Sequence, residues 1–185
     1  KKIRPGISLY ELGKTISSEI TRRGFKPIRN LYGHSIGQYL IHAGMNVPNY
    51  PERTFIIYKL RPGTLVAIEP FATNGRGFVR DGPIVNIYAY TGRKPKAHLA
   101  DDEAELLSFI EREYKTLPFA PRWLAGRTGI PEDRLLDVIK RLEAKGVIKG
   151  YPVLVEAGRG LVSQFEHTFL VLKNEVLITT LPGTT

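Results

Sequence analysis

The residues that could carry chemistry in this sequence are histidines and glutamates set in three short stretches. His34 and His42 lie in residues 30–44, which read NLYGHSIGQYLIHAG, among glycines, an amide and a tyrosine. Glu69 lies in the later sequence AIEPF, and Glu166 lies in QFEHTF. Imidazole and carboxylate are suitable ligands for Mn, Fe, Co or Zn in a hydrolytic site. These side chains are therefore candidates for a metal site.

Each of these candidates also has a simpler explanation. A glutamate on a strand can face solvent freely, and a single histidine is more often a structural hydrogen-bonding residue than a ligand. His34 and His42 are eight residues apart, a spacing that matches no helical metal motif such as the i, i+4 pair of zincins. Spacing alone leaves both explanations open.

Two predicted strands would position the glutamates. Residues 64–72 and 161–172 are rich in β-branched and apolar side chains, which favours strands. Because side chains alternate along a strand, Glu69 would share its face with Leu65, Ala67 and Phe71. In the second strand Gln164, Glu166 and Thr168 would form a polar face, with Phe165, His167 and Phe169 buried on the other. A carboxylate in such a strand is costly unless it is paired or coordinated.

Residues 7–23 are predicted to form a helix that starts at the N-cap Ser8, because apolar residues recur every three or four positions. Residues 25–50 are expected to be irregular strand and loop. Further strands are predicted at 55–58, at 78–90 with a break at 81–83, and at 176–180, which would close a terminal hairpin.

The composition changes after residue 95. Helices are predicted at 100–114, briefly at 122–124, and at 131–145, followed by a strand at 147–155. Helices followed by a short hairpin resemble a winged-helix unit. We therefore divide the chain into a first segment (1–95), an inserted helical subdomain (96–155) and a final β-hairpin (156–185).

Composition excludes some kinds of site and partner. The sequence has no cysteine, which excludes disulfides and thiolate ligands, and no apolar run approaches the roughly 18 residues that span a bilayer. The net charge of +9 comes from residues 1–95, which hold 15 Lys and Arg against 5 Asp and Glu; residues 96–155 hold 10 of each. This basic surplus fits an anionic surface such as RNA or simply a solvated basic face.

Together, the stretches GHSIGQYLIHAG, AIEPFAT and QFEHT resemble the type II methionine aminopeptidases, in their archaeal form. The resemblance covers essentially the whole chain, including FKPIRNLYGH, TLPFAPRWL and YPVL. It implies an α+β fold, the C-terminal half of the pita-bread fold, with an inserted winged-helix-like subdomain. It also implies removal of the N-terminal methionine from nascent proteins in the cytoplasm.

The resemblance implies a role for each candidate. His34, Glu69 and Glu166 match ligands of a centre of two divalent ions (Co, Mn, Fe or Zn), and Glu69 also matches the proton shuttle. His42 matches a residue that contacts the substrate near the scissile bond. The walls of the methionine pocket match Ile41, Phe71 and Tyr151.

The chain departs from this family in one respect: it has no match to two aspartate ligands and a catalytic histidine of an N-terminal half. We therefore expect a fragment, inactive alone, whose partners are that missing half and peptides that begin with methionine. The basic residues 1–95 are a candidate contact with the ribosome. The alternative is a non-catalytic pita-bread relative that binds RNA or ribosomes.

Overall fold

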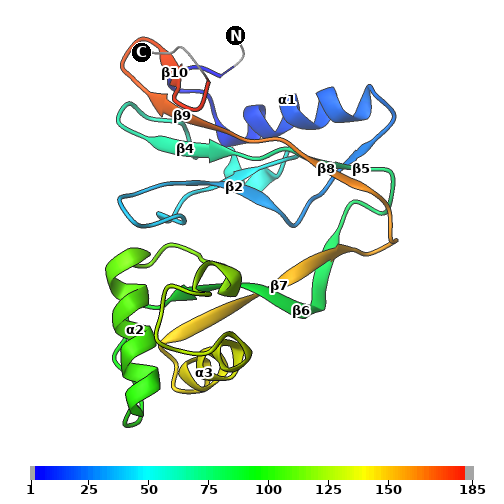
Figure 1. The fold of residues 1–185 in the computed structure, drawn as a ribbon. Coiled ribbons are helices and arrows are strands. Elements are labelled where there is room, and N and C mark those ends of the chain that lie inside the picture. Colours follow the sequence, from blue (N-terminus) through cyan, green and yellow to red (C-terminus); the bar gives the residue numbers. More distant parts are fainter. Residues whose placement is uncertain (1–2, 182–185) are drawn as a thin grey trace. The chain divides into compact units, whose positions relative to one another are not determined.

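A computed structural model describes residues 3–181 of the chain (Figure 1). The elements in chain order are α1 (Leu9–Thr21), β1 (Lys26–Pro27), β2 (Tyr32–Ser35), β3 (Asn46–Pro48), η1 (Arg53–Phe55), β4 (Leu65–Ile68), β5 (Phe71–Thr73), β6 (Val79–Tyr90), α2 (Asp101–Glu113), η2 (Pro121–Trp123), α3 (Glu132–Ala144), β7 (Ile148–Glu156), β8 (Val162–Gln164), β9 (His167–Val171) and β10 (Val176–Ile178). No helix among these residues is long and apolar enough to cross a bilayer.

The chain folds into two compact units. Residues up to 80 and from 155 onward make the first, and residues 81–154 make the second. Within the described residues, β6 runs without the expected break at 81–83 and pairs with β7, which is why this compact unit includes residues 81–95. The predicted division of the chain at residue 96 stays a prediction. Tyr88 of β6 exchanges backbone hydrogen bonds with Phe119, and both residues are buried in the core of the helical unit. The winged-helix character of this unit stays a prediction.

The first unit is built on two antiparallel sheets, one of five strands in the order β10-β9-β4-β2-β3 and one of three in the order β1-β5-β8. The apolar face of α1 packs on the larger sheet, with Leu12 and Ile16 in one core with Val66. The helix starts as predicted, with the Ser8 hydroxyl accepting a hydrogen bond from the Glu11 N–H at 3.2 Å. The β9–β10 hairpin is also as predicted.

Two predicted long strands are broken, and both breaks occur at glutamates. β4 ends before Glu69 and β5 starts after Pro70, while β8 ends before Phe165 and β9 starts after Glu166. β4 pairs with β9 in the larger sheet, and β5 pairs with β8 in the smaller one. The β4–β5 segment and the β8–β9 segment therefore pass from one sheet to the other at the same place. Proline cannot donate a ladder hydrogen bond, but its carbonyl accepts one from Phe165 N–H at 3.2 Å. Alternation therefore does not carry across the breaks, and the Phe165 ring, 66% exposed, is not buried as expected.

The strand predicted at residues 55–58 is wrong. A 3-10 helix, η1, precedes bends in this stretch, and Ile57 is 78% exposed. A short apolar run does not distinguish a strand from an exposed loop, because the difference lies in pairing partners that are distant in the sequence.

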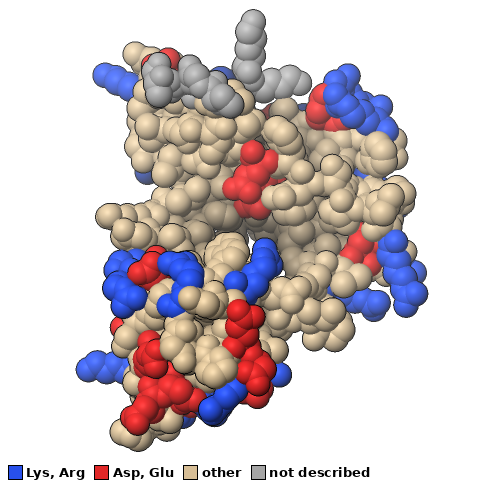
Figure 2. Space-filling model, viewed as in Figure 1, with Lys and Arg blue, Asp and Glu red and all other residues tan. Residues whose placement is uncertain are grey.

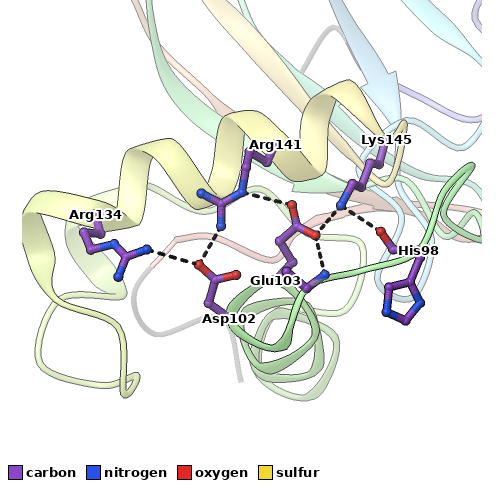
Figure 3. Close-up of polar contacts among 7 residues, drawn as sticks. His98, Asp102, Glu103, Arg134, Arg141 and Lys145 are labelled. Carbon is purple, nitrogen blue, oxygen red and sulfur yellow. Dashed lines mark hydrogen bonds and ion pairs between the residues drawn. The ribbon is translucent and has the colours of Figure 1, made fainter.

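The second unit packs α2 against α3, close to the predicted bounds of both helices, and a polar cluster links the two helices (Figure 3). The Glu103 carboxylate, 1% exposed, accepts hydrogen bonds from Ala100 N–H at 2.8 Å, Arg141 at 3.0 Å and the Lys145 ammonium. Burial alone would raise the pKa of Glu103, but these hydrogen bonds outweigh it and lower that pKa. Both blue and red surfaces lie on this unit in Figure 2, and several of its charged side chains form ion pairs with one another.

Candidate metal centre

His34 lies on β2, an inner strand of the larger sheet, opposite Ala67 of β4. The preceding Gly33 makes this position possible: a Cβ there would lie 2.3 Å from the carbonyl oxygen of Ala67, so a larger residue would push the two strands apart. Close approach of β2 to β4 brings the His34 Nε2 atom 2.9 Å from Oε1 of Glu69. Both side chains are 14% exposed.

Glu69 and Glu166 face one another because the two strands break together. The Gln164 amide lies between them, and its Nε2 is 3.4 Å from Oε2 of Glu69 and 3.4 Å from Oε2 of Glu166. The imidazole of this site comes from β2, the amide from the last residue of β8, and the two carboxylates from the two strand breaks. Figure 1 labels the strands on either side of these breaks.

The two carboxylates have no cationic partner among residues 3–181, since no Lys or Arg there forms a salt bridge with either of them. Burial raises the pKa of Glu69, and the nearby charge of Glu166 raises it further, while His34 opposes both effects. A nearby carboxylate disfavours the ionised form of Glu69, and a bound cation would favour it.

His42 is on the loop between β2 and β3, and its ring centroid lies 4.3 Å from that of His34. The loop returns through Gly44, whose φ of +95° is one that other residues rarely adopt. Ile41, the neighbour of His42, is partly buried. Phe71 is the first residue of β5 and pairs in register with Gln164, the residue that contacts both carboxylates. The fold thus holds His42 against His34 and places Phe71 opposite Gln164.

Tyr151 is on β7 in the second unit, where the Lys149 ammonium lies 4.9 Å from the centre of its ring. Its place in a methionine pocket stays a prediction, as do the ligand roles of His34, Glu69 and Glu166.

The donor set fits a divalent cation in part. One imidazole nitrogen and two carboxylates without a cationic partner suit Mn, Fe, Co or Zn, and a bound cation would favour the ionised form of Glu69. The Nδ1 atom of His34 is buried without a hydrogen-bond partner in the described part of the chain. Within residues 3–181, however, no three His, Cys, Asp or Glu side chains gather closely enough to hold a metal ion. Further ligands would be needed to complete the site.

The sequence did not predict the contacts of Gln164 with both glutamates and indicated only that this residue belongs to a polar face. A signal was present, because Pro70 inside a predicted strand is evidence for a break. With a break at Glu69-Pro70, the amide opposite that break becomes the residue placed to contact both glutamates.

A family model and several curated relatives match this chain, and both indicate the same family of metallopeptidases. The model of metallopeptidase family M24 matches residues 1–173. The methionine aminopeptidases of Pyrococcus abyssi and Pyrococcus horikoshii are 49% and 48% identical to the chain over 177 residues, and that of Saccharolobus solfataricus is 41% identical. These alignments cover 96% of this chain but only 58% of each relative.

Solved structures share the fold at low sequence identity. A thermophilic Arx1 structure matches with a TM-score of 0.76 at 15% identity, over 96% of this chain and 46% of that one. The methionine aminopeptidase of Thermotoga maritima matches with a TM-score of 0.53 at 20% identity, over 96% of this chain and 44% of that one.

Proposed function

The chain belongs to metallopeptidase family M24 and has the pita-bread fold predicted from its motifs, and we propose that it is the part of a methionine aminopeptidase that supplies His34, Glu69 and Glu166. The substrate would be a peptide with a free N-terminal methionine. The chain spans about 58% of the length of the relatives it matches, so the activity of the whole protein is part of this proposal.

The observation that carries the proposal is the paired strand break. It brings Glu69 and Glu166 to one place, joins them through Gln164, and holds Glu69 2.9 Å from His34. The Glu69 side chain is only 14% exposed, and a buried charge without a cationic partner is costly. A fold that needed Glu69 only for stability would gain by pairing it with a Lys or Arg. A site that binds cations leaves such a carboxylate available.

Two divalent ions are the cofactor that we propose, with His34, Glu69 and Glu166 among their ligands. Such ions, when bound, polarise a peptide carbonyl and make a water molecule acidic enough to attack it.

The other functions belong to side chains of this chain. Glu69 would accept a proton from the attacking water and return it to the leaving amine. Its Oε1 lies 2.9 Å from the His34 imidazole, and burial raises its pKa, which supports this role. His42 would donate a hydrogen bond to the substrate carbonyl, and its ring centroid, 4.3 Å from that of His34, supports a place beside the metal ligands. Ile41 and Phe71 would offer apolar contacts to the flexible methionine side chain, and the role of Tyr151 rests on the motif resemblance alone.

The proposal requires ligands from outside the chain. Three donors are too few for two metal ions, so we expect no turnover by residues 1–185 alone. Activity would appear when the remaining part of the enzyme is supplied.

The test compares the chain alone with the chain plus the part of Pyrococcus abyssi methionine aminopeptidase that it does not span. Each is loaded with Mn²⁺ or Co²⁺ and given a Met-Ala-Ser peptide, and free methionine is measured by mass spectrometry. We expect methionine release by the pair only, and none from the same peptide acetylated at its N-terminus. A pair that assembles and binds metal but releases no methionine would overturn the proposal.

A further inference from the structure

A second concave site lies in the first unit, between the last turns of α1 and the segments that carry β1 and β5. The cavity has a volume of about 410 Å³ and is lined by Ser17, Thr21, Lys26, Pro27, Arg29, Tyr50, Pro51 and Arg76. This volume is within the range of small-ligand sites, roughly 300–1,000 Å³. Three of the eight lining residues are cations and none is a carboxylate.

The three cations are held together by the backbone. Lys26 of β1 pairs in register with Thr73 of β5. Arg29 donates its backbone N–H to the carbonyl of Gly77 at 2.9 Å, which places it beside the loop that carries Arg76. That loop is fixed in turn, because the backbone N–H of Arg76 donates to a buried carboxylate, Glu156, at 2.5 Å.

None of the three cations has an ion pair within the described residues, whereas Arg22 and Arg23 nearby both pair with Glu19. The Arg29 guanidinium lies 5.8 Å from the centre of the Tyr50 ring, which orients it without neutralising it. Collecting like charges around one cavity is unfavourable unless an anion binds there.

Attraction to the carbonyl end of α1 does not account for this arrangement. That end favours nearby cations within about one turn, and Arg22 and Arg23 directly follow the helix. Arg29 and Arg76 come from other segments: the backbone N–H of Arg29 donates to Gly77 in the loop that carries Arg76, and that of Arg76 donates to Glu156.

We propose that this cavity is a phosphate-binding site, separate from the metal centre. Guanidinium and ammonium groups are the side chains that recognise phosphate oxygens, and the Ser17 side chain offers a hydroxyl beside them. The phosphate can belong to an RNA backbone or to a small phosphorylated molecule. RNA is the first choice to test because the first unit holds 15 Lys and Arg against 7 Asp and Glu, an excess that would attract a polyanion.

The test measures binding of a fluorescein-labelled 12-nucleotide oligouridylate to the 185-residue chain by anisotropy, between 50 and 200 mM KCl. Three phosphate contacts contribute a slope of about −2 in log K against log salt for a single strand. The triple variant Lys26→Ala, Arg29→Ala, Arg76→Ala should therefore lose that slope and bind roughly tenfold more weakly at 50 mM KCl.

The matched control removes the same charge from exposed positions of the same unit that do not line the cavity: Lys14→Ala, Arg53→Ala and Lys173→Ala. All six side chains are exposed, so both variants should fold, and circular dichroism checks this. Equal loss of RNA binding in the two triple variants would overturn the site, because it would show only a diffuse basic surface.

Parallel arms use inorganic phosphate and ATP, with binding measured by calorimetry. Binding of either that is lost in the cavity variant and kept in the control supports the site and identifies a small phosphorylated ligand. Absence of binding by the oligonucleotide, phosphate and ATP alike overturns the proposal. Methionine release is not read in any arm, so this result is independent of the proposed function.

Discussion

Glu103 in the second unit and Glu69 in the first are both largely shielded from water, but the fold treats them differently. Glu103 accepts hydrogen bonds from Arg141, Lys145 and a backbone N–H, and its pKa is lowered. Glu69 lies near another carboxylate and an amide, with one imidazole contact, and its pKa is raised. A paired carboxylate holds structure together, while an unpaired one leaves its charge available to a ligand.

The cations show the same contrast. Arg141 and Lys145 bridge α2 and α3 by binding carboxylates (Figure 3). Lys26, Arg29 and Arg76 surround a cavity without a carboxylate. Unpaired groups of both signs thus occur in the first unit, and they mark the two sites proposed for it.

Removing the paired carboxylate should give the largest loss of stability. We expect Glu103→Ala to lower the free energy of unfolding of the second unit by about 1–3 kcal/mol, because it breaks three hydrogen bonds and removes the ion-pair partner of Lys145. Urea unfolding followed by circular dichroism measures this. The control, Asp137→Ala, removes the same charge from an exposed position on α3 and should change little. Equal stability of the two variants would contradict the structural role of Glu103.

Substitution of Glu156 should cause a smaller loss of stability, and the size of this loss should depend on pH. Its carboxylate accepts four backbone N–H bonds, from Gly160, Gly158, Arg76 and Gly77 at 2.5 to 3.0 Å, which lower its pKa. A lowered pKa means that this stabilisation is complete above the ordinary glutamate pKa and is lost as the pH falls through the folded-state value. Glu156→Gln should lower Tm at pH 7 by roughly 5–10 °C, and the difference from wild type should shrink below about pH 4.

The control for this prediction is Glu175→Gln in the exposed β9–β10 turn, which should leave Tm unchanged at both pH values. A Glu156→Gln deficit that stayed constant from pH 7 to pH 3 would show that the side chain acts through packing and not through its charge.

Substitution of Glu69 should give the smallest change in the free energy of unfolding, and this change should be a gain and not a loss. Glu69→Gln should leave the unfolding free energy of the metal-free chain unchanged or raise it by up to about 1 kcal/mol, because it removes one of two facing charges. Functional residues often cost stability in this way. A loss as large as that of Glu103→Ala, measured by the same urea unfolding, would place Glu69 among the structural carboxylates and weaken the comparison.

Local signals in the sequence were sufficient for the helices. Ser8 and the three- to four-residue spacing of apolar side chains identified α1, and acidic residues at their starts identified α2 and α3. These features act between residues close in the chain, so the sequence displays them directly.

The strand breaks could not be predicted in the same way. Whether the strand continues through Glu69 depends on its pairing partners. β4, before the break, pairs with β9, and β5, after it, pairs with β8, about 95 residues away in the sequence. The motifs identified His34, Glu69 and Glu166, but not the bridging amide of Gln164, because its importance arises only when both strands break at the same place. The cluster of Lys26, Arg29 and Arg76 was likewise invisible beyond a general basic surplus.

The central claim, that the unpaired carboxylates serve a ligand and the paired one serves the fold, is tested most directly by one double comparison. Glu166→Gln and Glu103→Ala are each introduced into the chain supplemented with the missing part of the Pyrococcus abyssi enzyme, and kcat/KM for methionine release is measured beside Tm. We predict that Glu166→Gln lowers kcat/KM by at least about 100-fold with Tm unchanged, while Glu103→Ala lowers Tm and leaves kcat/KM of the folded protein within about twofold. Full methionine release by Glu166→Gln would contradict the account.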